Sequence, residues 1–334
     1  MKLTVQLLTW NGGKYIPYLF NSLKNQTFKN WKLNILDNNS SDNTVDLIKN
    51  ELNNFDIGYK LDINKENVGF ARGHNQLFKK IDTEYFLLLN QDLFLEKDCF
   101  EKLVNFLDIN KQAAAVSPRL MRWNFPNTDS AELVDSLGLR VFKNRRVVDL
   151  YNGKKYSDIS ENIKKKREVE VFGVSGALPM FRCNVIKDLV FEDGGFFDKN
   201  YGSYKEDVDL AYRINSCGYK SFVLLDSVAY HDRSSENSSS VIKNKKGQSD
   251  YIRYNSYKNH LMTLYKNEYW QNFILDSPWI LWYELRKFLW FLFFDRGVLK
   301  GLGEIWNLRK DLRNKRKIIK NKRKVDWIKM RKWV

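Results

Sequence analysis

The stretch Tyr85-Phe86-Leu87-Leu88-Leu89-Asn90-Gln91-Asp92 joins an uninterrupted apolar run to an abrupt polar end. A short apolar run of this kind is typical of a strand buried on both faces of a parallel sheet. In open α/β folds, ligands bind at the carboxyl ends of such strands. The carboxylate of Asp92 is therefore the first candidate for chemistry.

The residues before this strand alternate between strand-like and helix-like segments. Strands are predicted at 3–9, 31–36 and 57–63, and amphipathic helices follow the polar turns at 11–13, 38–42 and 67–69. Strands separated by helices imply right-handed crossovers and a parallel sheet. We expect an α/β fold with a mostly parallel central sheet flanked by helices.

Downstream of Asp92 the pattern is less regular. It predicts a helix at about 97–107, then a surface insertion with short strands at 117–168. A strand follows at 169–174, a helix begins at Glu206-Asp207, and a short strand at 221–225 leads to His231. We assign 1–233 to one domain with halves at about 1–116 and 117–233, and the serine-rich run at 234–250 to a flexible loop.

The remaining residues, 251–334, are predicted to be a helical C-terminal region of different character. Residues 270–294 are rich in aromatic side chains, and their apolar part at 279–294 contains charges and is too short to span a bilayer comfortably. Residues 309–334 carry thirteen basic and two acidic side chains, a net +11 of the total +16. We expect this region to lie on an anionic membrane surface.

Composition excludes several classes of protein. Without the basic tail the charge is about +5 over 308 residues, which does not indicate a nucleic-acid-binding body. The three cysteines lack CxxC spacing and are odd in number, which argues against a disulfide framework or zinc knuckle and favours a reducing cytosol. The amino terminus begins with a strand pattern and shows no leader-like segment. We therefore expect a cytoplasmic location.

Carboxylates occur at the ends of four predicted elements: Asp37, Asp92, the pair Glu206-Asp207, and Asp226. Each is weak evidence alone, because acids are common at such positions. An acid at a helix N-terminus also stabilises the helix as a cap or through its dipole. A purely structural role therefore remains open for Glu206 and Asp207.

Five short motifs follow one another along the chain: LLTWN at 7–11, DNNSSD at 37–42, NVGFARGHN at 67–75, NQD at 90–92 and YKEDVDLAYR at 204–213. This order is similar to that of family 2 glycosyltransferases, and the chain most resembles their rhamnosyltransferase-type branch. The resemblance covers about residues 1–265, and its strength is the ordered set.

The resemblance implies a GT-A fold that binds a nucleoside diphosphate sugar across the first four strands. Carboxylate oxygens suit the base and ribose, and a glycine lets the backbone approach the ligand closely, although Gly69 could equally be an ordinary turn residue. The positions that match donor-binding residues are Thr9, Asn11, Asp37, Asn39, Gly69, Arg72, Asn75, Asn90, Gln91 and Asp92.

The resemblance also implies a divalent cation, Mg²⁺ or Mn²⁺. Asp92 matches the last acid of the family's DxD-type motif, but Asn90 stands where the first aspartate often occurs. His231 matches a position where some relatives contribute a histidine to the metal or diphosphate. Carboxylate, phosphate and water oxygens fit either hard cation. We expect Asp92 and His231 to share the metal.

For catalysis, the resemblance makes Asp207 the base that deprotonates the acceptor, with Glu206 second. Helical spacing places Asp207 on the core-facing side and lets Asp209 pair with Arg213. Segments that match the sugar and acceptor side of the cleft contain Ser175, Gly176, Ala177 and Gly195. Trp10 and Trp123 could stack on a sugar or base, although most tryptophans are core residues.

The implied reaction is an inverting, metal-dependent transfer in cell-surface polysaccharide synthesis. dTDP-rhamnose is the favoured donor and a UDP-sugar the other option, and the acceptor would be a hydroxyl of a glycan or lipid-linked molecule at the inner face of the cell membrane. Two alternatives remain: a nucleic-acid-binding protein that uses its basic tail, and a non-catalytic GT-A scaffold. The aromatic helices could also pair with another copy of the chain.

Overall fold

The computed structural model describes residues 1–123, 125–126, 131–233 and 250–334. The loop predicted at 234–250 lies outside the described residues except for its last residue. The helices of the body are α1 (Ile16–Lys24), α2 (Thr44–Leu52), α3 (Phe70–Phe78), α4 (Cys99–Ile109), α5 (Glu161–Lys164), α6 (Cys183–Asp188) and α7 (Glu206–Ser216), with short 3-10 turns at Gly13–Tyr15 and Tyr156–Asp158.

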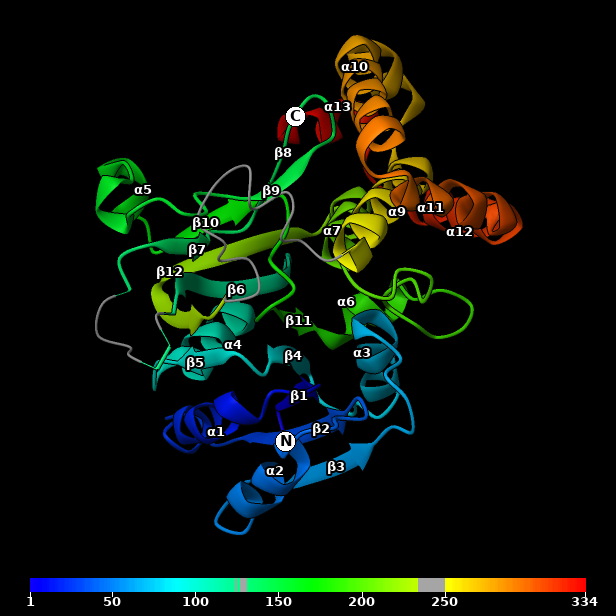
Figure 1. Ribbon diagram of the computed structural model, residues 1–334. Coiled ribbons are helices and arrows are strands. Elements are labelled where there is room, and N and C mark those ends of the chain that lie inside the picture. The colour runs from blue at the N-terminus through cyan, green and yellow to red at the C-terminus, as the bar shows by residue number, and fades with distance from the viewer. Residues whose placement is uncertain (124, 127–130, 234–249) are drawn as a thin grey trace.

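A mixed sheet forms the centre of the body (Figure 1). Its main order is β10-β12-β6-β11-β4-β1-β2-β3, with β5 paired to β12 and β7 to β6, while β8 and β9 form a separate hairpin. The strands are β1 (Leu3–Thr9), β2 (Trp31–Asp37), β3 (Tyr59–Ile63), β4 (Tyr85–Asn90), β5 (Leu93–Leu95), β6 (Ala113–Arg122), β7 (Val134–Ser136), β8 (Leu139–Val141), β9 (Val147–Asp149), β10 (Glu168–Val171), β11 (Met180–Arg182) and β12 (Lys220–His231).

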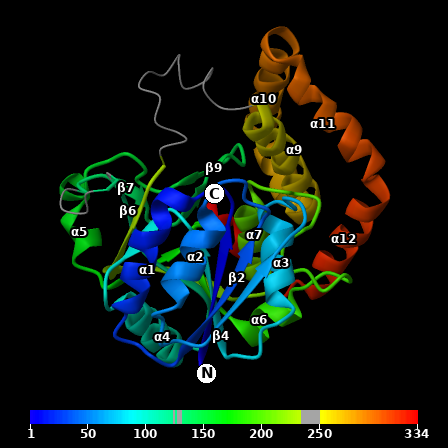
Figure 2. The same cartoon turned by 60° about the horizontal axis from the view of Figure 1, so that its bottom comes forward.

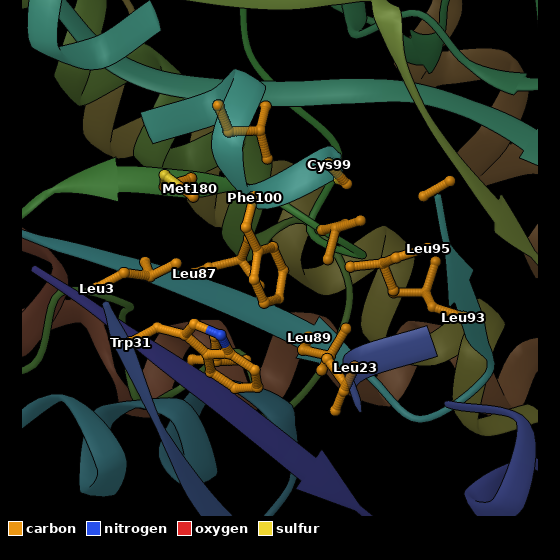
Figure 3. Close-up of a cluster of buried hydrophobic side chains, with 14 of the residues drawn as sticks. Leu3, Leu23, Trp31, Leu87, Leu89, Leu93, Leu95, Cys99, Phe100 and Met180 are labelled. Carbon is orange, nitrogen blue, oxygen red and sulfur yellow. The ribbon is translucent and has the colours of Figure 1, made fainter. Parts of the chain in front are cut away.

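The decisive strand β4 is buried on both faces, as its apolar run predicted. Leu87 and Leu89 belong to one buried cluster, together with residues of α1, α2 and α4, as Figure 3 shows in part. Phe86 and Leu88 face the other way, into a cluster with residues of α3, α6 and α7. Successive strand side chains point to opposite faces, so one strand contributes to both layers.

The four amino-terminal strands are mutually parallel, as predicted, but two strand predictions were wrong. The segment predicted as a short strand at 221–225 is the long strand β12, which continues to His231. The predicted surface insertion begins inside β6, a central ten-residue strand. Alanines at 113–115 and Pro118 disfavour a strand locally, and burial between neighbouring strands overrides that preference.

The C-terminal region is helical, as predicted. It contains α9 (Asp250–Asn267), α10 (Trp270–Phe294), α11 (Arg296–Asn307), α12 (Arg309–Lys322) and α13 (Trp327–Met330), then a 3-10 turn at Arg331–Trp333. Helix α9 packs against α7, α11 and α12, whereas α10 projects from the body (Figures 1 and 2). No helix of the described residues is long and apolar enough to cross a membrane.

The basic tail contacts the body through several of its cations. Lys315 is almost completely buried and pairs with Asp198 at 2.6 Å, and Lys332 pairs with Glu170 at 2.7 Å. Lys322 donates to the carbonyl of Val190. Some of the basic side chains of the tail, which were expected to attract a membrane, therefore pair with groups of the protein itself.

Candidate active site

Parallel pairing brings the first candidate residues to one edge of the sheet. Thr9 at the end of β1 is opposite Asp37 at the end of β2, and Leu8 is opposite Asn90 at the end of β4. The carboxyl ends of these three strands thus form the edge where open α/β folds bind ligands.

Asp37 organises the loop that follows β2. Its carboxylate is fully buried and accepts hydrogen bonds from the Thr9 hydroxyl at 2.8 Å and from the backbone N–H of Ser40 at 2.7 Å. Asn11 joins the same loop, because its side-chain oxygen accepts from the N–H of Ser41 at 2.8 Å. Asn39 lies within the loop at a φ of 64°. Four of the predicted donor-binding residues are therefore neighbours.

The turn after β1 is fixed by Gln91. The side-chain amide of Gln91 accepts from the N–H of Trp10 at 2.9 Å and donates to the Trp10 carbonyl at 3.0 Å. A Cβ on Gly12 would lie only 2.2 Å from this amide, so a larger residue there would displace the Gln91 side chain from these hydrogen bonds. Gln91 thus connects the NQD motif to the first motif through backbone contacts.

Asp92 and His231 meet at the same edge. Strand β12 pairs antiparallel with β5, which places His231 opposite Leu93. The Nε2 atom of His231 lies 3.4 Å from Asp92 Oδ1, and its Nδ1 atom lies 2.9 Å from Asp135 Oδ2. Asp135 is fully buried and also pairs with Arg233 at 2.5 Å. The sequence predicted the first contact and gave no sign of Asp135.

Charge controls the protonation of this group. Burial alone would lower the pKa of His231, but the nearby charge of Asp92 and the hydrogen bond to Asp135 raise it to about 10. Burial would raise the pKa of Asp135, and the His231 and Arg233 contacts outweigh it and lower that pKa. The imidazole is therefore protonated at neutral pH in the protein without ligands.

Asp92 and His231 are the candidate ligands of a divalent cation. Within the described residues, no three His, Cys, Asp or Glu side chains are arranged to hold a metal ion. Asp92 and Nε2 of His231 supply two adjacent donors, and Asp135 holds the far nitrogen, which is the arrangement of metal-binding histidines. These residues fit a cation that takes its other ligands from a diphosphate and water.

A lysine beside this group was not predicted from the sequence. Lys14, on the turn after β1, has its ammonium 3.9 Å from Asp232 Oδ2 and 4.4 Å from the ring centroid of Tyr15. Tyr15 donates a 2.6 Å hydrogen bond to the same carboxylate. Lys14 is half exposed. Its contact with Tyr15 raises the pKa of its ammonium, and the charges of Asp232 and Asp92 add to this in a smaller measure.

Asp207 is connected to the NQD motif through two adjacent residues. The backbone N–H of Gly176 donates to Asp207 Oδ2 at 3.3 Å, and the carbonyl of Ala177 accepts from the N–H of Asn90 at 3.2 Å. Asp207 also lines a small cavity with Gly176, and its helix presents Leu210, Ala211 and Ile214 to that cavity, as predicted from the spacing. Ser175 is buried beside them.

The two acids of the pair differ in their surroundings. Glu206 is 7% exposed, and its Oε2 atom has no hydrogen-bond partner in the described residues. Burial, helped by the charge of Asp207, raises the pKa of Glu206 to about 8. Burial also raises the pKa of Asp207, although Lys205 opposes this. Raised carboxyl pKa values at a cleft are typical of catalytic acid–base groups.

A buried ion-pair network holds the helix that carries these acids. Asp209 pairs with Arg213 at 3.0 Å, which confirms the predicted pairing, and with Lys266 of α9 at 2.9 Å. Lys266 is completely buried and also pairs with Asp198 at 2.6 Å. The position of α7 therefore depends on α9.

The motif at 67–75 contacts the loop before α7. Gly69 has a φ of 83°, and a Cβ there would lie 3.0 Å from the carbonyl oxygen of Gly202. Asn75 donates to the Phe197 carbonyl at 2.9 Å and accepts from the Phe197 N–H at 3.0 Å. A Cβ on Gly195 would lie 2.6 Å from the Asn75 amide. Arg72 is exposed and donates to the Lys199 carbonyl.

These contacts give Asn75 and Gly195 a structural role. Their predicted contacts with donor and acceptor remain predictions. Trp123 is buried among Tyr15, Tyr18 and Phe125, whereas Trp10 is 52% exposed at the site edge.

The family model for glycosyl transferase family 2 matches residues 4–190, more than half of the chain. The chain belongs to glycosyl transferase family 2. This confirms the predicted family.

Among curated proteins, the chain is 26% identical over 232 residues to the O-antigen chain rhamnosyltransferase RfbN of Salmonella typhimurium. The aligned residues cover 69% of this chain and 66% of that relative. It is also 28% identical over 91 residues to a teichoic acid poly(glycerol phosphate) polymerase of Staphylococcus epidermidis, 27% of this chain and 13% of that relative. The chain thus spans less than two thirds of these relatives.

Solved structures confirm the predicted GT-A fold. S. aureus TarS 1-349 in complex with UDP-GlcNAc matches with a TM-score of 0.55 at 17% identity, over 96% of this chain and 91% of that one. The mannosyltransferase PcManGT of Pyrobaculum calidifontis, in complex with GDP-Man and Mn²⁺, matches at 0.53 and 17%, over 92% of this chain and 75% of that one.

Proposed function

We propose that the protein is an inverting, metal-dependent glycosyltransferase that uses a nucleoside diphosphate sugar. The observation that carries the proposal is the connection of two candidate groups at one edge: Asp207 is bonded to Gly176, and its neighbour Ala177 is bonded to Asn90 of the NQD motif. These contacts support a proposed base that adjoins a proposed diphosphate site, as a direct transfer requires.

In the proposed donor site, Thr9, Asn11 and Asp37 with Asn39 surround the base and ribose, and the segment with Gly69 and Arg72 lies on the other side of the nucleotide. Asp92 and His231 would hold Mg²⁺ or Mn²⁺, which neutralises charge on the departing diphosphate. His231 would offer Nε2 to the cation as a neutral imidazole, while Asp135 keeps the ring oriented through Nδ1. Lys14 adds a positive charge near the same phosphates.

In the proposed transfer, the carboxylate of Asp207 takes the proton from an acceptor hydroxyl. The resulting oxygen nucleophile forms a bond to the anomeric carbon while the bond to the diphosphate breaks on the opposite face. Glu206 stays protonated at neutral pH because its pKa is about 8, so the pair carries one negative charge rather than two. Gly176 orients the base through its N–H.

The donor favoured by similarity to a rhamnosyltransferase is dTDP-rhamnose, and a UDP-sugar is the second option. The proposed acceptor is a glycan or lipid-linked molecule in cell-surface polysaccharide synthesis, at the inner face of the cell membrane. The relatives named for O-antigen and teichoic acid synthesis support this class of product.

A nucleotide-sugar panel tests the proposal. Thermal unfolding of the purified protein would be followed with dTDP-, UDP- and GDP-sugars, each with Mn²⁺, with Mg²⁺ or with a chelator. We expect a rise in Tm for at least one donor that depends on the cation. The proposal fails if no nucleotide sugar raises Tm or is hydrolysed under any of these conditions.

A further inference from the structure

Helix α10 exposes an apolar face along its whole length. Six side chains define this face, each between 40% and 70% exposed: Ile274, Leu281, Trp282, Leu285, Leu289 and Phe293. Their spacing places them on one half of the helix, while Asn272, Asp276, Ile280 and Phe291 are buried on the other half. A contiguous exposed patch of this kind marks an interaction surface.

The acids of α10 are turned inward. Asp276 is buried and pairs with Arg145 at 2.9 Å and with Arg331 at 3.0 Å. Glu284 pairs with His260 at 2.7 Å. All residues of α10 are described, and Arg286 is its only exposed charged side chain. The outward face is therefore apolar with one positive charge.

The next two helices add a net positive charge. Six basic residues are exposed between 296 and 317: Arg296, Lys300, Arg309, Lys310, Arg313 and Lys317. The two acids in that span are paired with lysines, since Glu304 contacts Lys258 and Asp311 contacts Lys315. The surface that follows the apolar face thus favours a negatively charged partner.

We propose that the apolar face of α10 binds the interface of a lipid bilayer that contains anionic headgroups. A 25-residue helix is about 37 Å long, and it can lie in the plane of the interface with its apolar half in the acyl region. Exposed tryptophans such as Trp279 and Trp282 favour that boundary. A second copy of the chain would bring like positive charges together, which opposes a symmetric dimer through this face.

Docking would place the site beside the membrane. In Figure 2, α9 and α10 rise from the body on the side opposite the amino terminus. The parallel strands run toward this same side, away from the amino terminus. Asn259 of α9 donates to the carbonyls of Tyr201 and Tyr204, in the loop that leads to Glu206. Helix α9 therefore connects the docked helix to the proposed catalytic pair. We infer further, and this step rests on the proposed function, that the acceptor is carried by a membrane lipid.

Vesicle co-sedimentation of the full chain tests the docking. Wild-type protein is compared on vesicles of phosphatidylcholine alone and with 30% phosphatidylglycerol, beside the double variant Trp282→Ser, Leu285→Ser. The control is Tyr59→Ser, Ile63→Ser, which removes two equally exposed apolar side chains from strand β3. We expect binding to anionic vesicles that falls at least tenfold in the α10 variant and stays unchanged in the control, with all Tm values alike.

Three results would overturn the proposal. The first is wild-type protein that stays in the supernatant with anionic vesicles. The second is an α10 variant that sediments like wild type. The third is that wild-type protein is a dimer by light scattering, whereas the α10 variant is a monomer that still binds lipid like wild type. That result would show that the apolar face binds a second copy of the chain. The absence of both donor binding and donor hydrolysis would contradict the proposed function and leave the lipid result intact.

Discussion

The Nε2 atom of His231 lies 3.4 Å from Oδ1 of Asp92, although the two residues are far apart in the sequence. The backbone fixes this contact, because the N–H of Asp232 donates to the carbonyl of Asp92 at 3.0 Å. The pair is therefore built before any ligand binds. Such preorganisation is what a cation site shared with a diphosphate needs.

Asp135 positions His231 without facing the ligand edge itself. Replacing Asp135 by Asn should weaken Mn²⁺ binding about 10- to 100-fold, because the imidazole loses its orienting carboxylate. The measurement is calorimetric titration of Mn²⁺ in the presence of UDP or dTDP. Asp226→Asn, at an exposed carboxylate, is the matched control and should bind like wild type. Equal affinity in both variants would show that Asp135 does not support a metal site.

The raised pKa of Glu206 affects stability in a defined direction. The folded protein holds a proton on Glu206 up to about pH 8, whereas the unfolded chain releases it near 4.5. The unfolding free energy should therefore fall as pH rises between these values. Urea unfolding from pH 5 to 8.5 should show this decline in wild type and a flatter profile in Glu206→Gln. Glu66→Gln, at an exposed site, should keep the wild-type slope.

Lys266 holds α7 to α9 through two buried carboxylates. Lys266→Met should cost about 3–5 kcal/mol of unfolding free energy, because Asp198 and Asp209 would lose a buried partner. Lys300→Met changes an exposed lysine and should stay within about 0.5 kcal/mol of wild type. Denaturant unfolding measures both. Similar stability of the two variants would contradict the structural role of the network.

Gly69 combines a positive φ with a close backbone contact. Gly69→Ala should destabilise the fold by about 1–3 kcal/mol, because a backbone at φ 83° and ψ 174° is adopted readily only by glycine. The Gly202 carbonyl, 3.0 Å from the added Cβ, adds a further cost. Gly58→Ala is the control, because no atom lies within 4 Å of its added Cβ. We expect Gly58→Ala to be close to neutral by the same measurement. A neutral Gly69→Ala would refute the strain argument.

Local sequence patterns were sufficient for the amino-terminal half of the fold. The apolar run at Leu87 to Leu89 and the turns at Gly12 and Gly69 determine strand and helix positions through local chemistry. Strand β6 could not be predicted, because its alanines and Pro118 favour other structures and only pairing with β12 and β11 makes it a strand. Long-range pairing leaves no local pattern.

The candidate site likewise contains residues that the sequence predicted and residues that it did not. Asp92, His231 and Asp207 were predicted from their motifs and their places at element ends, and their roles stay predictions. Asp135 and Lys14 were missed, because Asp135 acts through contacts between residues distant in sequence and Lys14 looks like any surface lysine in a turn. The role of a buried charged residue can be recognised only when its contacts in the fold are known.

Asp92 is expected to serve the donor site, and Asp207 is expected to serve as the base. The most direct test measures cation-dependent nucleotide-sugar binding and hydrolysis side by side in wild type, Asp92→Asn and Asp207→Asn. We predict that Asp92→Asn loses Mn²⁺-dependent donor binding, and that Asp207→Asn keeps it within about threefold while its turnover falls at least 100-fold. Wild-type binding and turnover in both variants would contradict the account.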